Sequence, residues 1–324
     1  MARIDTHWYR ASSWLWLLSP LSLLFYLLTG IRRRLYRLGV LQVVTFSTPV
    51  IIVGNITVGG SGKTPLVTYL VELLRRHGYQ PGLVSRGYGG KAGTWLQAVT
   101  AESDTTVVGD EAVLLSRRCN CPMVVGPDRA AAVEQLLREH DVDVVISDDG
   151  MQHYRLGRDI EIAVIDGERR LGNGLCLPAG PLRETKRRLR SVDFVVSNGV
   201  ARTGEWPMQL LPGEPRSLED ERTRPLMDFL REKVHAVAAI GNPERFFQTL
   251  CDAGLSIIKH PYADHHVFVA ELEFADELSV MMTEKDAVKY FSFANARHWY
   301  LPVDARLDDE FSRQLLERLE RLRG

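Results

Sequence analysis

The chain has 324 residues, of which 45% are hydrophobic and 25% are charged, a balance typical of a globular protein long enough for two domains. Its net charge of −1 gives no overall attraction to nucleic acid, so we expect no nucleic-acid partner. Its four cysteines lack the paired spacing of a zinc site, which favours a reduced, cytosolic setting over a disulfide framework.

The first element in chain order is an apolar run. Residues 14–28 carry no charge, and four arginines follow within residues 31–37. Spanning a bilayer takes about 20 apolar residues, and this run is shorter and contains Pro20 and two serines. A helix lying in the membrane interface is therefore supported at least as well as a complete span, with the arginines on anionic phosphates. We predict a membrane-associated helix with a basic flank over residues 1–40.

Two other interpretations of this run are weaker. A cleavable signal peptide lacks a small-x-small cleavage site here, and an ordinary core helix would carry its apolar residues on one face. If the run spans a membrane, the larger arginine cluster after it places the rest of the chain in the cytoplasm.

A glycine-rich turn follows the strand pattern of residues 49–53 and leads into a helical pattern that opens at Lys63. This order is typical of a loop whose backbone N–H groups bind the phosphates of a nucleotide. Lys63 is predicted to reach the β- and γ-phosphates, and Thr64 to offer its hydroxyl to Mg²⁺. The strict pattern has glycine where this chain has Thr57, so a turn without a ligand is the alternative. The predicted ATP-binding residues are Thr57, Val58, Gly59, Gly60, Ser61, Gly62, Lys63 and Thr64.

Strand-like and helix-like segments alternate up to about residue 198, which predicts an α/β fold with a parallel sheet and crossover helices. We place this domain, similar to the P-loop NTPases, at residues 41–205. Residues 201–233 are rich in Pro, Glu and Arg and are predicted to be a linker. A second, smaller α/β domain follows, so that residues 206–324 comprise the linker and this domain.

Two adjacent aspartates, Asp148 and Asp149, end the buried strand pattern that starts at residue 142. Neighbouring carboxylates repel each other, and a divalent cation removes that penalty. The pair therefore indicates a metal site, with a simple turn as the alternative. Gln152 and His153 follow directly and are candidates for orienting a phosphate or a water molecule.

The proline- and glycine-containing segment 177–184 ends in Arg183 and Glu184. A rigid loop of this kind can hold a guanidinium on a phosphate and a carboxylate near a metal ion. A surface turn is the alternative.

Asp110 and His265 are candidates for general base catalysis. A hydroxyl nucleophile gains from a carboxylate that accepts its proton, and a histidine beside that carboxylate can tune it. Taken alone, these residues are explained better by helix capping at Asp110 and a solvated turn at 264–266. Residues 283–286 faintly resemble an element that reads a purine base, although helix capping by Thr283 explains them equally well.

Together, these motifs resemble the tetraacyldisaccharide 4′-kinase family of lipid A biosynthesis. The resemblance extends over nearly the whole chain, and Thr57 fits the family although it departs from the generic loop. It rests on the order and spacing of residues 55–65, 85–88, 109–111, 148–153, 177–184, 241–243, 264–265 and 283–286.

The resemblance implies transfer of the γ-phosphate of ATP, with Mg²⁺, to the 4′-hydroxyl of tetraacyldisaccharide 1-phosphate, which gives lipid IVA. The implied partners are this acylated lipid and the inner membrane, at its cytoplasmic face, and we expect a monomer. The family departs from this chain at Ala112 and Thr185, where it often has proline. The implied roles are Lys63 and Thr64 for phosphate and metal, Asp148, Asp149 and Glu184 for metal, Arg86, Gln152 and Arg183 for phosphate or substrate, and Asp110 with His265 for activation of the hydroxyl.

Since His265 belongs to the second domain and the phosphate loop to the first, we predict a cleft that closes about a hinge and excludes water. The main alternative function is a membrane-tethered P-loop ATPase or GTPase switch. A membrane scaffold without enzymatic activity is a third.

Overall fold

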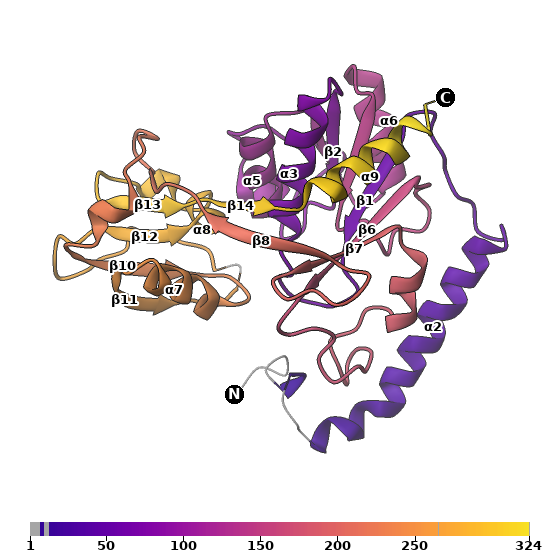
Figure 1. The fold of residues 1–324 in the computed structure, drawn as a ribbon, viewed down its shortest axis with the longest axis horizontal. Coiled ribbons are helices and arrows are strands. Elements are labelled where there is room, and N and C mark those ends of the chain that lie inside the picture. The colour runs from indigo at the N-terminus through magenta and orange to yellow at the C-terminus, as the bar shows by residue number, and fades with distance from the viewer. Residues whose placement is uncertain (1–6, 10–12, 265, 324) are drawn as a thin grey trace.

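The computed structural model describes residues 7–9, 13–264 and 266–323. Figure 1 shows two lobes side by side, with one long helix along the outside of the larger lobe. The larger lobe is built on a nine-stranded sheet and the smaller lobe on a five-stranded sheet. The predicted α/β architecture, a parallel-sheet domain with a second, smaller α/β domain, is confirmed.

The larger sheet is parallel in its centre and antiparallel at its edges. In spatial order it consists of β14 (Val303–Arg306), β8 (Trp206–Pro212), β7 (Phe194–Asn198), β6 (Ile160–Asp166), β1 (Val50–Gly54), β5 (Val144–Asp148), β2 (Pro81–Ser85), β4 (Met123–Val125) and β3 (Gln97–Ala98). β1 pairs in parallel with β5 and β6, whereas β14–β8 and β3–β4 are antiparallel. Every residue of β1, β5 and β6 is buried, as a parallel sheet covered on both faces requires.

Helices cover both faces of this sheet. They are α3 (Lys63–Arg76), α4 (Thr105–Val108), α5 (Asp110–Cys119), α6 (Arg129–Glu139), α9 (Asp309–Glu320) and the 3-10 helix η2 (Lys186–Ser191). Side chains alternate along β1, so Ile51 and Val53 pack in one core with α3, α5 and α9. Val50 and Ile52 point the other way and pack in a second core with α6.

The smaller lobe repeats the same layering on a smaller scale. Its sheet has the order β11 (Ser256–Pro261), β10 (Lys233–Ala238), β12 (Val280–Thr283), β13 (His298–Leu301) and β9 (Arg216–Ser217). Its helices are α7 (Pro243–Asp252), α8 (Glu284–Ala287), η3 (Leu226–Phe229) and η4 (Phe291–Phe293). As the periodicity predicts, Phe246, Phe247 and Leu250 of α7 lie on one face and pack against this sheet.

The chain returns to the larger lobe at its C-terminal end. β8 lies within the segment predicted as a linker, but it is a strand of the larger sheet, and so is β14. Within β8 only Met208 is buried, which is why this segment shows no long apolar pattern. The expected boundary between residues 205 and 206 stays a prediction. We propose instead that the smaller lobe comprises residues 213–302, because the sheets divide the chain there.

The two connections between the lobes run together. β8 and β14 pair as an antiparallel ribbon from Gln209 and Arg306 to Pro212 and Val303. The pairing continues where the chain leaves the larger lobe, since the Gly213 N–H donates to the Pro302 carbonyl at 2.9 Å.

The predicted N-terminal helix is present as η1 (Ser13–Leu18) and α2 (Ser19–Arg37). Along residues 14–37 it is long and apolar enough to cross a membrane, by length and composition. Within α2 only Ser22 is buried, and its hydroxyl donates to the Cys176 carbonyl at 2.6 Å. The exposed apolar residues are Trp14, Trp16, Leu17, Leu21, Leu23, Leu24, Tyr26, Leu27, Leu28 and Ile31.

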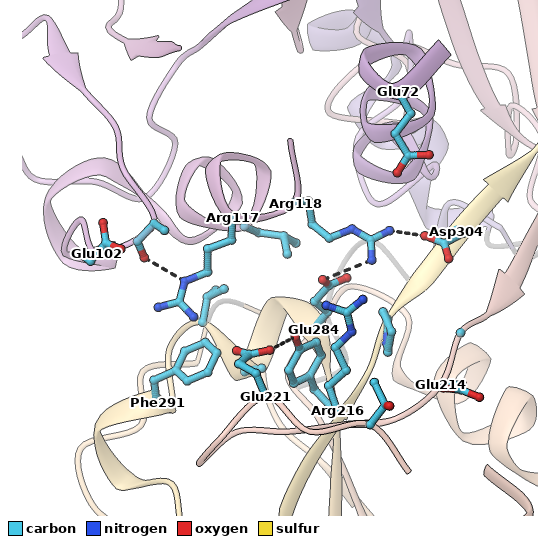
Figure 2. Close-up of a pocket in the computed structure, with 18 residues that line it drawn as sticks. Glu72, Glu102, Arg117, Arg118, Glu214, Arg216, Glu221, Glu284, Phe291 and Asp304 are labelled. Atoms are coloured by element: carbon cyan, nitrogen blue, oxygen red, sulfur yellow. Dashed lines mark hydrogen bonds and ion pairs between the residues drawn. The ribbon is translucent and has the colours of Figure 1, made fainter. Parts of the chain in front are cut away.

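A polar cavity of about 650 Å³ lies beside the connection between the lobes, lined by residues of α3, α5, α8 and β14 (Figure 2). Arg118 of α5 contacts Glu284 of α8 at 3.5 Å and also pairs with Asp304 of β14. Burial raises the pKa of Glu284 to about 7, against the opposing effect of Arg118, and Asp304 adds to the rise.

This raised pKa predicts a pH-dependent gain in stability for Glu284→Gln. The folded state holds a proton on Glu284 more tightly than the unfolded chain does. The free energy of unfolding therefore falls as the pH rises from about 4.5 to about 7, and it stays lower above that range. We expect the variant to melt about 2 °C or more above the wild type at about pH 8 and to match it near pH 4. Thermal unfolding at several pH values measures this, and a pH-independent difference would contradict it.

Candidate active site

The glycine-rich turn lies between the end of β1 and the start of α3, as predicted. Gly62 caps α3 with a φ of +93°, and a Cβ there would come within 2.6 Å of the Asn198 side-chain nitrogen. Glycine is therefore required at this position. Thr57 does not adopt a positive φ and instead forms an antiparallel bridge with Leu182. Since no turn conformation is demanded of Thr57, the departure from the strict pattern costs the loop nothing.

The turn is held by hydrogen bonds to the segment 177–184. The Val58 N–H donates to the Pro181 carbonyl at 2.9 Å, and the Arg183 N–H donates to the Ile56 carbonyl at 2.7 Å. Two segments that are more than a hundred residues apart in the sequence therefore form one backbone unit. The predicted site residues Lys63 and Arg183 are brought together by this unit.

Asp149 joins two of the three predicted cations, Lys63 and Arg183. Lys63 Nζ lies 3.5 Å from Asp149 Oδ1, and an Arg183 nitrogen lies 2.9 Å from Asp149 Oδ2. Burial alone would raise the pKa of Asp149, but Lys63 and Arg183 overcome it and lower this pKa to about 2. Asp149 is thus a stable anion between two cations.

Asp148 differs from Asp149 in its hydrogen bonding and in the direction of its pKa shift. Its side chain is buried, and its Oδ1 atom has no hydrogen-bond partner among the described residues. Burial raises the pKa of Asp148 to about 7, although Lys63 opposes this. The adjacent carboxylates therefore differ, because the charge of Asp149 is compensated and that of Asp148 is not.

Gln152 and Glu184 form the next layer. The Gln152 amide donates to the Asn55 carbonyl at 3.0 Å and to Glu184 Oε1 at 2.9 Å. Glu184 also accepts a hydrogen bond from the Tyr154 hydroxyl, and Arg188 lies 3.5 Å from the same oxygen. Both oxygens of Glu184 are thus already engaged.

Asp110 is the first residue of α5 and is buried. Its Oδ1 atom accepts a hydrogen bond from the Glu111 N–H at 2.9 Å, in keeping with the acidic first turn expected there. Gly109 before it adopts a φ of +94°, and a Cβ at this position would lie 2.3 Å from the Tyr88 carbonyl oxygen. His265, the predicted partner of Asp110, lies outside the described residues, whereas its neighbour Asp264 is described.

The smaller lobe borders the phosphate loop directly. A Cβ on Gly241 would lie 3.3 Å from Asp264 and 3.9 Å from the Gly60 nitrogen. Arg245 of α7 donates to the Asn198 side-chain oxygen at 2.8 Å. Asn198 in turn donates to the Ser61 carbonyl at 3.2 Å. Residues of both lobes therefore surround the predicted phosphate position.

Arg86 and Arg129 complete the basic side of the site. Arg86, predicted to contact phosphate or substrate, is exposed directly after β2, and its charge helps to lower the pKa of Arg129. Arg129 was not predicted. It is 1% exposed, it donates to the Gly126 carbonyl at 2.5 Å, and its Nε and one terminal nitrogen have no partner among the described residues. Burial lowers the pKa of Arg129 to about 10, while Asp148 and Asp149 oppose this.

Sequence motifs do not identify Arg129 or the bridging pair Asn198 and Arg245. An arginine at a helix start and an asparagine at a strand end are common in any α/β protein. For Asn198, which ends β7, the strand order of the sheet is the one usable signal. β7 lies two places from β1, so its carboxyl end falls near the phosphate loop.

Comparison with known proteins gives consistent results. A family model described as tetraacyldisaccharide-1-P 4′-kinase matches residues 14–320. The chain is 53% identical over 315 residues to tetraacyldisaccharide 4′-kinase of Nitrosococcus oceani, which covers 97% of this chain and 93% of that protein. It is 47% identical over 332 residues to the protein of the same name from Hahella chejuensis, covering 100% and 98%.

A solved structure is also similar. The crystal structure of LpxK from Aquifex aeolicus in complex with ATP superposes with a TM-score of 0.82 at 26% identity. The match covers 95% of this chain and 99% of that one, so it includes both lobes.

Proposed function

The chain belongs to the tetraacyldisaccharide 4′-kinase family, and from this premise we propose how its own residues carry out the reaction. It is a kinase that transfers the γ-phosphate of ATP to the 4′-hydroxyl of tetraacyldisaccharide 1-phosphate, forming lipid IVA in lipid A biosynthesis. The alternative of a membrane-tethered ATPase or GTPase switch is not favoured, because the family match extends through the second lobe.

The triphosphate of ATP binds at the turn between β1 and α3. Residues 59–64 provide backbone N–H groups and the positive end of the α3 dipole, whereas the Val58 N–H already donates to the Pro181 carbonyl. Lys63 and Arg183 are the two cations that contact Asp149. We assign Lys63 to the transferring phosphate, where negative charge must be neutralised, and Arg183 to phosphate or substrate beside it. Arg86 and Gln152 line the same region.

The residues present fit a magnesium ion. Asp148 offers a buried carboxylate oxygen without a partner among the described residues, and the charge of Lys63 acts on it. No group of three or more His, Cys, Asp and Glu side chains in the described part of the chain forms a metal cluster. This suits Mg²⁺, which binds through one or two carboxylates together with phosphate oxygens and water. When bound, the ion supplies charge neutralisation on the phosphate oxygens.

Asp148 and the Thr64 hydroxyl would hold this ion, with Asp149 next to them. The metal role expected of Glu184 stays a prediction. Since Gln152 and Tyr154 already donate to its two oxygens, we assign Glu184 to orienting Gln152.

Asp110 accepts the proton of the 4′-hydroxyl as the sugar oxygen bonds to the γ-phosphorus, the bond from the γ-phosphorus to the β,γ-bridging oxygen breaks, and ADP leaves. Its carboxylate is buried at the start of α5 and faces Lys285 of the smaller lobe, which also lies near Asp264. His265 follows Asp264 directly, which supports the predicted pairing of Asp110 with His265. Closure of the smaller lobe over the site excludes water that would otherwise hydrolyse ATP.

A transfer assay tests this function directly. Purified full-length protein is incubated with Mg²⁺, ATP labelled at the γ-phosphate, and tetraacyldisaccharide 1-phosphate in mixed micelles. We expect the label to appear in the lipid. Release of free phosphate at one rate with or without lipid, and no labelled lipid, would support the ATPase alternative instead.

We further place the protein as a monomer on the cytoplasmic face of the inner membrane. The exposed apolar side chains of α2 fit a lipid surface, and the arginines after them fit anionic headgroups. The acylated substrate lies in the same membrane, and ATP is available on its cytoplasmic side.

Charged substitutions on η1 and α2 are expected to release the protein from membranes. Leu17, Leu21 and Leu24 are 81%, 56% and 52% exposed, so replacing all three by aspartate leaves the packing of the larger lobe intact. The transfer energy of three leucines predicts at least about a tenfold loss of vesicle binding. Sedimentation with anionic vesicles measures it. The control is Met227→Asp, a 70% exposed apolar residue of the smaller lobe. Equal sedimentation of the triple variant and the wild type would place the membrane contact elsewhere.

A further inference from the structure

The two lobes contact each other through a pair of short charged segments. α8 of the smaller lobe lies against α5 of the larger lobe, and two successive residues of α8 form ion pairs with it. Glu284 lies 3.5 Å from Arg118 at the C-terminal end of α5, beside the cavity in Figure 2. Lys285 Nζ lies 2.9 Å from Glu111 in the first turn of α5. The second pair is at the candidate active site and the first is not.

Lys285 is surrounded by carboxylates of both lobes. Besides Glu111, its ammonium lies 4.0 Å from Asp110 Oδ2 and 3.9 Å from Asp264 Oδ1. The Lys285 side chain is 18% exposed and that of Asp110 is 7% exposed, so solvent screens the interaction between these two groups little. Because three carboxylates within about 4 Å of one point would repel each other strongly, the ammonium is needed to keep them together.

The electrostatics agree with this geometry. Burial would lower the pKa of Lys285, but Glu111 and Asp110 raise it, so Lys285 stays a cation. Burial would raise the pKa of Glu111, but Lys285 and Lys63 lower it. Glu111 is therefore an anion that Lys285 separates from the carboxylate of Asp110.

We propose that Lys285 is a positioning residue for the reaction: the smaller lobe supplies, through α8, the cation that holds the Asp110 carboxylate in place against the incoming 4′-hydroxyl. The inference rests on the proposed role of Asp110 as the base. Lys285 itself does not touch the substrate, since its ammonium is already engaged by Glu111, Asp110 and Asp264. When α8 docks on α5, Lys285 thus fixes the Asp110 carboxylate. Proton acceptance by Asp110 therefore depends on the arrangement of the two lobes.

The test compares Lys285→Met, Lys285→Arg, Asp110→Asn and the double variant Lys285→Met/Asp110→Asn in the full-length protein. We expect Lys285→Met to lower kcat by at least about tenfold and to change the KM for ATP by less than about threefold. Lys285→Arg is expected to recover most of the kcat, because a guanidinium also pairs with carboxylates. The double variant is expected to be no slower than Asp110→Asn alone, since Lys285 acts through Asp110.

The matched control is Arg118→Gln, which removes the other ion pair between the same two helices. Glu284 can take up a proton when Arg118 is absent, because its pKa is already about 7. We expect kcat to stay within about threefold of the wild type. An equal loss of kcat in Arg118→Gln and Lys285→Met would show that docking of the lobes in general, and not Lys285, is responsible, and would overturn the inference.

Other outcomes also decide the matter. An unchanged kcat in Lys285→Met together with a large loss in Asp110→Asn would overturn the inference but leave the base assignment intact. A rise in the KM for lipid at unchanged kcat would assign Lys285 to the substrate instead. Full activity of Asp110→Asn would overturn both. If Lys285→Met fails to fold, as judged by thermal unfolding, Lys285→Gln supplies the same comparison with a polar side chain.

Discussion

Lys63→Met is expected to reduce kcat by at least about two orders of magnitude. Lys63 is the first residue of α3, directly after the glycine turn that we propose binds the phosphates of ATP. In the transition state of phosphoryl transfer, charge spreads over the transferring oxygens, and the protein contributes by neutralising it. Methionine keeps the length and packing of the side chain but carries no charge, so the loss falls on the chemical step.

The labelled-transfer assay measures this loss, and thermal unfolding checks the fold. We expect Lys63→Met to remain folded, because Asp149 keeps its contact with Arg183. Lys259→Met is the control: Lys259 is an exposed lysine of the smaller lobe whose ion pair is with Glu244. Lipid phosphorylation by Lys63→Met at the rate of this control would refute the assignment of the turn as the phosphate site.

Asp110→Asn is expected to lower kcat by at least about a hundredfold, with the KM for ATP within about threefold of the wild type. Asparagine preserves the size of the side chain and can still accept a hydrogen bond from the Glu111 N–H. It cannot take up the proton of the sugar hydroxyl. The defect should therefore appear in the rate of transfer and not in nucleotide binding.

Asp309→Asn is a matched control for this prediction. Asp309 also stands in the first turn of a helix, α9, but it is exposed and on the larger lobe away from the phosphate turn. If Asp110 served only to stabilise the first turn of α5, both substitutions would change the stability of the protein and leave kcat unchanged. A weakened ATP affinity in Asp110→Asn at normal kcat would instead assign this carboxylate to the nucleotide or its metal.

The sequence was most informative where the chemistry is local. β1, the glycine turn and α3 follow one another directly, so the strand pattern, the positive-φ glycines and the helical periodicity all point to the same structure. Asp149 could be placed near Lys63 because parallel neighbouring strands such as β1 and β5 end at the same edge of a sheet. Helix capping by Thr283, one of the two interpretations of residues 283–286, is present, because its hydroxyl accepts a hydrogen bond from the Asp286 N–H.

Contacts between distant segments were not predictable in this way. β8 is mostly exposed, so nothing in its composition shows that it pairs with β7 or that β14 joins it from the C-terminal end of the chain. Arg129 resembles any first residue of a helix, and its importance lies in its burial beside Asp148. Lys285 resembles a residue of a capped turn, because its partner Glu111 lies 174 residues away in the sequence. In each case the decisive property belongs to the tertiary structure.

The paired strands β8 and β14 have a mechanical consequence. The two strands are hydrogen-bonded side by side from Gln209 and Arg306 to Gly213 and Pro302. Such a ribbon resists sliding of one strand along the other but bends readily perpendicular to its plane. The proposed closure of the smaller lobe would therefore be confined to one direction of bending. On this proposal, each closure would return Lys285 to Glu111 and Arg245 to Asn198.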